Sequence, residues 1–352
     1  MSLDSFLVGG SKEKPQNKET QKEKVRTICY FSSSDMKVKW YFANQKKNLK
    51  ILYTKKVKWR EISSDLEFTT DLDLNKKNNS LEPILDQPIS KISILKSNLQ
   101  KAVRRQNLKS ALQSAKELYR LDPLILVRRL SIISLEDVIL LEDFPYLLFA
   151  MAVYPALKPD LDFLLRMVES LTLNPKRDYI PNFFKIDNMK LDHLLKVEKS
   201  SVLEESEISL LYSLCLRSSY GGLKCDVRMV LGYAQLWISR FLGESKEKWK
   251  KFLVSTTPKL SLELEKFNQN HLILEGVDFH TCPSMLKELL YHIKGLNSDK
   301  LKKIIWYCRS GINARGNKEE DFMKNKEKYW KIYLKIEAMI NKYSEIKIKE
   351  VF

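Results

Sequence analysis

The sequence predicts a mostly α-helical protein, in which an all-α helical domain follows a small antiparallel β-domain. Residues 25–62 alternate β-branched or aromatic residues with polar ones, which is typical of half-buried strands. From residue 92 onward apolar residues recur at three-to-four spacing, which is typical of amphipathic helices. Breaks rich in Pro and Gly separate the helical stretches, so we expect several helices joined by short loops.

Composition divides the chain into five segments. Residues 1–24 are polar and rich in Lys, Glu and Gln, which predicts a disordered tail. Residues 25–62 form the expected small basic β-domain. Residues 63–90 are acidic and read as a linker with room for one short strand. We expect the all-α domain over residues 91–318 and one long basic amphipathic helix over residues 319–352.

The β-domain contains two Val-Lys-Trp repeats, which end at Trp40 and Trp59. In strands over residues 37–42 and 49–62, both indoles would face the interior and the lysines would face outward. We expect residues 44–48 to join these two strands as a hairpin.

Lys56, Lys58 and Arg60 lie on the outer face of the predicted hairpin. One interpretation is a solvated face with no further role. The other is a ribbon that contacts nucleic-acid phosphates.

Two sequence features place helix boundaries in the all-α domain. Asp122 followed by Pro123 predicts an N-cap and the first residue of a helix. Ser134 and Asp137 have the spacing of a capping box, which predicts that another helix begins there.

The last segment combines an apolar stripe with a basic face. Tyr329, Tyr333, Ile336 and Ile340 follow helical spacing, and Lys328 is one of the lysines that fall mostly outside this stripe. Such a helix packs on one side, and its basic side either is solvated or contacts nucleic acid.

Charge and composition indicate the class of partner and the compartment. The 352 residues have a net charge of +17 and a pI near 9.4, with 15 basic and 6 acidic residues in 1–62 and 15 and 8 in 291–352. This balance favours nucleic acid as a partner, although an AT-rich genome also enriches Lys. No apolar run is long enough for a membrane span, no signal-peptide pattern is present, and the five cysteines are scattered. We therefore expect an intracellular protein of the nucleus or cytoplasm that is not secreted, with no membrane partner.

No motif in the sequence identifies a reaction. Walker A, G-x-S-x-G, H-E-x-x-H and C-x-x-C patterns are all missing, so we expect no cofactor and no metal, and we lean against an enzyme. The alternative is an enzyme whose site lies around Asp278, His280 and Cys282, which lie close together in the sequence. The other interpretation of these residues is a turn in which His280 is satisfied and Asp278 acts as a cap.

A Gly- and Arg-rich stretch provides a second candidate site. Arg309 and Arg315 flank a short loop with Gly311 and Gly316. Successive backbone N–H groups in such a loop can form a nest for phosphate. This loop has three possible roles. It is a site for phosphate or nucleic acid, a part of the alternative enzyme site, or a turn with only a structural role.

Residues 99–139 contain D-P, R-R-L and E-D elements in this order. This stretch resembles the helical region that follows the ATPase module in the Werner-helicase-interacting AAA+ family and its bacterial counterparts. The matching residues are Lys101, Arg104, Arg105, Ala111, Leu112, Asp122, Pro123, Arg128, Arg129, Leu130, Glu136 and Asp137.

The resemblance implies a helical scaffold like the collar of a clamp loader, which supports oligomerisation next to DNA. No ATPase module precedes the stretch in this sequence, so the resemblance carries no ATP hydrolysis. The basic residues of the stretch have two interpretations. Either Arg128 or Arg129 pairs with a carboxylate such as Glu136 or Asp137 and locks two helices, or Arg104 and Arg105, with Arg128 and Arg129, contact DNA phosphates.

Near the start of the sequence, Leu3, Phe6 and Leu7 resemble a degenerate sliding-clamp-binding peptide. The leading hypothesis is a nucleic-acid-associated scaffold or accessory factor in DNA replication or repair, with DNA favoured over RNA. A sliding clamp and further copies of the chain are additional expected partners. The alternatives are the enzyme described above and a pure protein-interaction scaffold.

Overall fold

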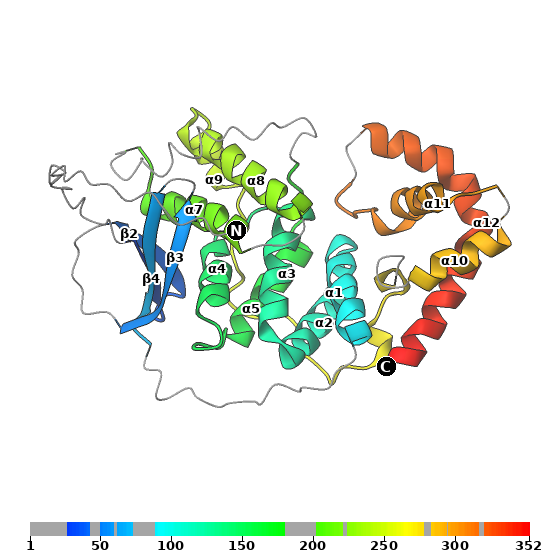
Figure 1. Cartoon of the computed structure of the whole chain (residues 1–352), viewed down its shortest axis with the longest axis horizontal. Coiled ribbons are helices and arrows are strands. Elements are labelled where there is room, and N and C mark those ends of the chain that lie inside the picture. The colour runs from blue at the N-terminus through cyan, green and yellow to red at the C-terminus, as the bar shows by residue number, and fades with distance from the viewer. Residues whose placement is uncertain are drawn as a thin grey trace, which may run out of the picture.

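The computed structural model describes residues 27–42, 50–59, 62–72, 89–179, 202–220, 224–277, 283–293, 295–316 and 320–352. A small sheet precedes a larger helical region (Figure 1), which confirms the predicted fold class. The strands are β1 (Thr27–Ser32), β2 (Lys37–Phe42), β3 (Lys50–Trp59) and β4 (Ile62–Thr70). The helices are α1 (Ile89–Arg104), α2 (Leu108–Leu121), α3 (Pro123–Glu136), α4 (Phe144–Val153), α5 (Leu161–Leu173), α7 (Glu205–Ser219), α8 (Lys224–Leu242), α9 (Lys246–Lys250), α10 (Pro283–His292), α11 (Ser298–Ile305) and α12 (Glu320–Val351).

The sheet has the strand order β2-β1-β4-β3 and is mixed, because β1 and β4 run parallel. The predicted hairpin between residues 37–42 and 49–62 is wrong, since β2 and β3 lie at opposite edges. The antiparallel partner of β3 is instead β4, which follows it directly. The acidic composition of residues 63–90 hides this strand, although Leu66 and Phe68 alternate into the core.

The inner face of the sheet packs on helices. Phe31 lies between Tyr146 and Phe149 of α4, with ring centroids 5.4 and 5.2 Å apart. Trp40 is buried as predicted, and its indole Nε1 donates to Ser213 Oγ of α7 at 3.3 Å. The sheet, helices α1–α5 and helices α7–α9 therefore share one hydrophobic core. At the outer edge of the sheet, β3 leaves Ile51 and Tyr53 exposed.

The predicted helix start at Asp122 is confirmed. The Asp122 carboxylate accepts a hydrogen bond from the Leu124 backbone N–H at 2.8 Å, and Pro123 occupies the first helical position. The second predicted start, at Ser134, is wrong, because α3 continues to Glu136 and Asp137 is its C-cap. Buried apolar residues of α3 on both sides of Ser134 keep the chain helical there.

A second hydrophobic cluster joins α10, α11 and α12. Tyr329, Tyr333, Ile336 and Ile340 of α12 are buried in it, as the apolar stripe predicts. The 32 residues of α12 span about 48 Å at 1.5 Å per residue, so this helix runs along the whole cluster (Figure 1). Ile94 of α1 belongs to the same cluster, which makes α1 common to both cores.

None of the helices in the described ranges combines the length and the apolar composition that a membrane span requires.

Replacing the cap residue tests the start of α3. We expect Asp122→Ala to lower the free energy of unfolding by about 1 kcal/mol, because the Leu124 N–H loses its acceptor. The matched variant Asp122→Asn keeps a side-chain oxygen and should lose only a few tenths. Urea denaturation of both variants measures the difference, and equal losses would contradict a capping role.

Candidate phosphate-binding site

Several predicted site residues lie outside what the structure describes. Lys56 and Lys58 belong to β3, but their side chains are not among the described ones. The following predicted residues lie entirely outside the described ranges: Arg60, the clamp-like peptide Leu3, Phe6 and Leu7, and Asp278, His280 and Cys282. Lys328 is exposed on α12, with its Nζ 5.5 Å from the ring centroid of Tyr329.

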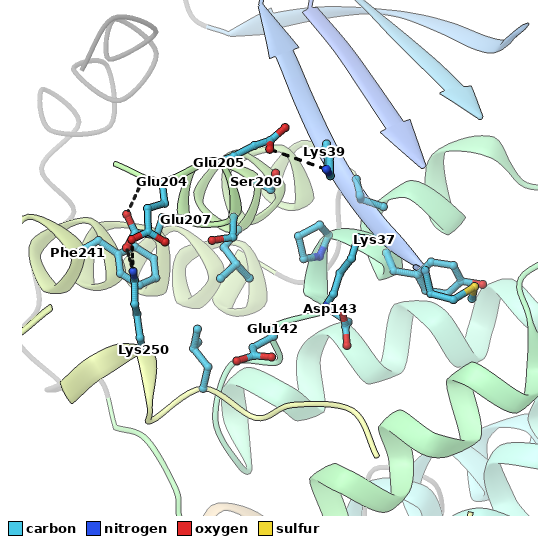
Figure 2. A pocket seen from close by; sticks show the side chains of 17 residues that line it. Lys37, Lys39, Glu142, Asp143, Glu204, Glu205, Glu207, Ser209, Phe241 and Lys250 are labelled. Carbon is cyan, nitrogen blue, oxygen red and sulfur yellow. Dashed lines mark hydrogen bonds and ion pairs between the residues drawn. The ribbon is translucent and has the colours of Figure 1, made fainter. Parts of the chain in front are cut away.

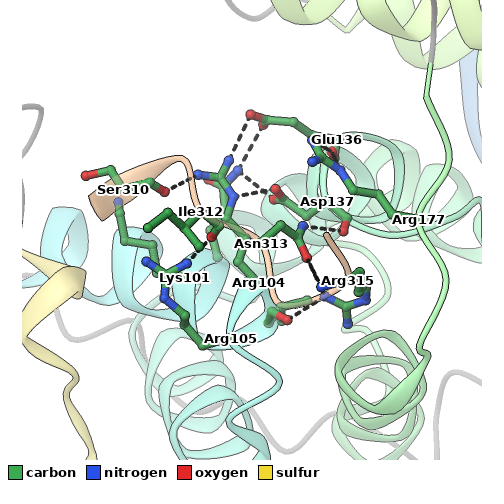
Figure 3. Close-up of polar contacts among 12 residues, drawn as sticks. Lys101, Arg104, Arg105, Glu136, Asp137, Arg177, Ser310, Ile312, Asn313 and Arg315 are labelled. Carbon is green, nitrogen blue, oxygen red and sulfur yellow. Dashed lines mark hydrogen bonds and ion pairs between the residues drawn. The ribbon is translucent and has the colours of Figure 1, made fainter. Parts of the chain in front are cut away.

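Arg104 lies in the interior and joins three parts of the chain (Figure 3). Its guanidinium Nε donates to Asp137 Oδ1, and a terminal nitrogen donates to Glu136 Oε1 at 2.9 Å. The other terminal nitrogen donates to the Ser310 carbonyl at 2.8 Å. Asp137 is fully buried, so this ion pair fixes the end of α1 against the end of α3.

Arg105 and Arg309 also point inward. The Arg105 guanidinium donates to the carbonyls of Ile312 and Arg309. Arg309 is 4% exposed and donates to Asn341 Oδ1 of α12 at 2.7 Å. Its π-helical turn closes at Gly311, where an added Cβ would lie 2.7 Å from the Trp306 carbonyl oxygen, so only glycine fits.

Arg315 caps two helices at once. One terminal nitrogen donates to the Val103 carbonyl of α1 at 2.8 Å, and the other donates to the carbonyls of Leu171 and Thr172 of α5 at 2.6 and 2.9 Å. These carbonyls lie in the last turns of their helices, where positive charge is favoured. Burial lowers the pKa of Arg315 to about 10.

These contacts correct two expectations. Arg104, Arg105, Arg309 and Arg315 do not form the phosphate-contacting surface that we expected, because their guanidinium groups bind carboxylates, amides and carbonyls inside the protein. An Arg–carboxylate network does lock the helices.

The partner of Glu136 and Asp137 in this network is Arg104, and neither Arg128 nor Arg129 lies within ion-pair distance of the two carboxylates. Arg104 takes this place because it is the last residue of α1, which ends beside the two carboxylates.

Arg128 and Arg129 instead line a cavity of about 250 Å³, which we call the basic cavity. It lies where α1, α3, α7 and α8 meet. Among the residues that the structure describes, four cationic side chains and one carboxylate face it. The lining residues are Lys96, Ile125, Arg128, Arg129, Ile132, Arg217, Tyr220 and Asp226.

The positive charges of the basic cavity are close to one another and partly removed from water. Burial, and then the nearby charge of Arg129, lower the pKa of Lys96. Burial also lowers the pKa of Arg129 and of Arg217, while the charge of Asp226 raises both and the charge of Arg128 lowers that of Arg217. Bringing like charges together in this way costs free energy that a bound anion would recover.

Neutral groups orient two of the arginines. Arg129 donates to Gln100 Oε1 at 3.1 Å, and Arg217 Nε donates to Ser131 Oγ at 2.9 Å. Within the described ranges, no carboxylate lies within 4 Å of the charged nitrogens of Lys96, Arg128 or Arg129. The cavity therefore keeps an excess of positive charge.

The pocket beside β2 has the opposite character (Figure 2). It measures about 380 Å³, and five carboxylates and three lysines line it. Lys37 pairs with Asp143 at 2.6 Å, and Lys250 pairs with Glu207 at 3.3 Å. The surplus of carboxylates makes this pocket unsuited to phosphate.

A larger groove of about 950 Å³ lies beside α2 and is lined by both lysines and aromatic rings. Among the described residues, four cations and one carboxylate line it, and two of the cations pair with that carboxylate. Lys91 and Arg120 both pair with Glu117, at 3.1 and 2.9 Å, and Lys116 Nζ donates to the Leu264 carbonyl at 3.3 Å. The basic cavity differs from this groove because three of its cations, Lys96, Arg128 and Arg129, form no ion pair within the described ranges.

Sequence patterns do not single out Lys96 and Arg217, because their neighbours in the cavity lie on helices far apart in the chain. In the part of the chain that the structure describes, no group of three or more His, Cys, Asp or Glu residues is placed to hold a metal ion. Comparison with protein-family models, curated proteins and solved structures finds no match to this chain.

Removing the buried carboxylate tests the network. We expect Asp137→Ala to lower the free energy of unfolding by about 3–5 kcal/mol, because buried Arg104 would lose its buried carboxylate partner and keep only the more exposed Glu136. The control is Asp162→Ala, whose pair with Arg166 is largely exposed and is worth at most about 1 kcal/mol. Urea denaturation measures both, and losses of similar size would contradict the central place of Asp137.

Proposed function

We propose that this protein is a nucleic-acid-associated accessory factor that binds phosphate groups of nucleic acid in its basic cavity. The observation that carries the proposal is that four cationic side chains from α1, α3 and α7 meet around one cavity, with one carboxylate among its described lining residues. Guanidinium groups bind phosphate oxygens through paired charge-assisted hydrogen bonds. The role is binding and scaffolding, without a reaction of its own.

The resemblance of residues 99–139 supports the same proposal. The R-R-L element of that stretch supplies Arg128 and Arg129, the two arginines that face the basic cavity. The Werner-helicase-interacting AAA+ family, which the stretch resembles, uses its collar-like region next to DNA. We therefore propose DNA replication or repair as the setting and favour DNA over RNA.

Additional contacts complete the proposed role. Lys328 lies exposed on the basic side of α12, where it provides a second surface for the phosphate backbone. Binding of a sliding clamp through Leu3, Phe6 and Leu7, and assembly with further copies of the chain, remain predictions from the sequence.

Salt dependence of binding tests the proposal. Affinity for fluorescent DNA should fall steeply between about 50 and 200 mM salt, because bound cations displace counterions from the phosphates. The double variant Lys96→Gln/Arg128→Gln should reduce the slope of log K against log salt by about one to two units. Fluorescence anisotropy with single- and double-stranded DNA and with RNA measures these slopes.

The matched control removes the same charge elsewhere. Lys287 of α10 and Lys303 of α11 are exposed and lie outside the basic cavity, so Lys287→Gln/Lys303→Gln should leave the slope nearly unchanged. Absence of binding by the native protein at low salt would reject the proposal. Equal weakening by both double variants would show that only net charge matters.

A further inference from the structure

The basic cavity is shaped for one anionic group. Proteins that follow a nucleic-acid strand use an extended basic groove along successive phosphates. Here the cationic groups come from three helices and converge on about 250 Å³. Such a volume admits a phosphate with its attached sugar.

The charge of the cavity favours a phosphate with more than one negative charge. In the described part of its lining, the carboxylate of Asp226 faces four cations: Lys96, Arg128, Arg129 and Arg217. A phosphodiester inside a strand carries one negative charge. A phosphomonoester carries about −1.5 to −2 near pH 7 and presents three strong acceptor oxygens.

The cationic groups also have suitable positions. Arg128 is exposed at the mouth, while Arg129 and Arg217 lie deeper and are oriented by Gln100 and Ser131. Preset donors of this kind lose little conformational entropy on binding. Several of them can therefore engage different oxygens of the same phosphate.

We propose that the basic cavity binds the terminal phosphomonoester of a nucleic-acid strand, so that the protein distinguishes phosphorylated strand ends from hydroxyl ends. This inference rests on the proposed function, because it names the group of the nucleic acid that enters the cavity. An internal phosphodiester offers these cations one negative charge and two free oxygens, so they hold it less strongly than a terminal phosphomonoester.

The experiment uses one DNA sequence in three forms, with a 5′-phosphate, a 3′-phosphate or hydroxyl groups at both ends. Anisotropy at fixed salt should show roughly tenfold tighter binding of one phosphorylated form than of the hydroxyl form. Lys96→Gln/Arg128→Gln should abolish this preference, and Lys287→Gln/Lys303→Gln should preserve it. The preference should also shrink below about pH 6, where the phosphomonoester gains a proton.

Each other outcome has a definite meaning. Equal affinity for all three forms, with salt-dependent binding intact, overturns the end-recognition proposal and leaves the proposed function standing. If the Lys96→Gln/Arg128→Gln variant still prefers the phosphorylated strand end, the basic cavity is not the site that recognises it. Stabilisation by inorganic phosphate or a mononucleotide in thermal unfolding, with no binding of any DNA or RNA, overturns both proposals in favour of a small phosphate ligand.

Discussion

The buried ion pair between Arg104 and Asp137 is the contact on which the arrangement of the helices depends. It connects the end of α1 to the end of α3, and the same guanidinium reaches the Ser310 carbonyl in the turn before α12. Burying a carboxylate is unfavourable unless its charge and hydrogen bonds are fully matched. Asp137 meets this requirement only when these segments are in their native places, so the pair selects one arrangement among many apolar packings.

The same network determines the shape of the basic cavity. Gln100 donates to Glu136 and Asp137 at 2.9 and 2.8 Å and accepts from Arg129. An amide thus connects the carboxylates to the cavity without placing negative charge in it. Arg104 pairs directly with both carboxylates, whereas Arg129 contacts them through Gln100 and is stabilised by their charges from a distance. The hydrogen bonds around Glu136 and Asp137 therefore have two effects. They stabilise the packing of the helices, and they orient Arg129 in the basic cavity.

Local sequence patterns predicted the individual helices and strands better than they predicted which strands pair and which side chains meet. Period-two and three-to-four spacing located β2 and α12, and Asp122 marked the start of α3. Strand pairing was missed because acidic residues in β4 obscured its alternation. The arginines were recognised as unusual, but Arg315 binds carbonyls at the ends of two distant helices. Spacing along a sequence contains no information on such contacts.

The position of α1 in both hydrophobic clusters has a consequence for cooperativity. Leu95 and Leu99 belong to the first core and Ile94 to the second, so neither core closes without this helix. Arg315 adds a second connection, because it follows α11 in the chain yet caps α1 and α5. Loss of the C-terminal helices would expose apolar surface on α1 and uncap two helix ends. The two cores therefore behave as a single folding unit, in which local damage spreads rather than remaining confined.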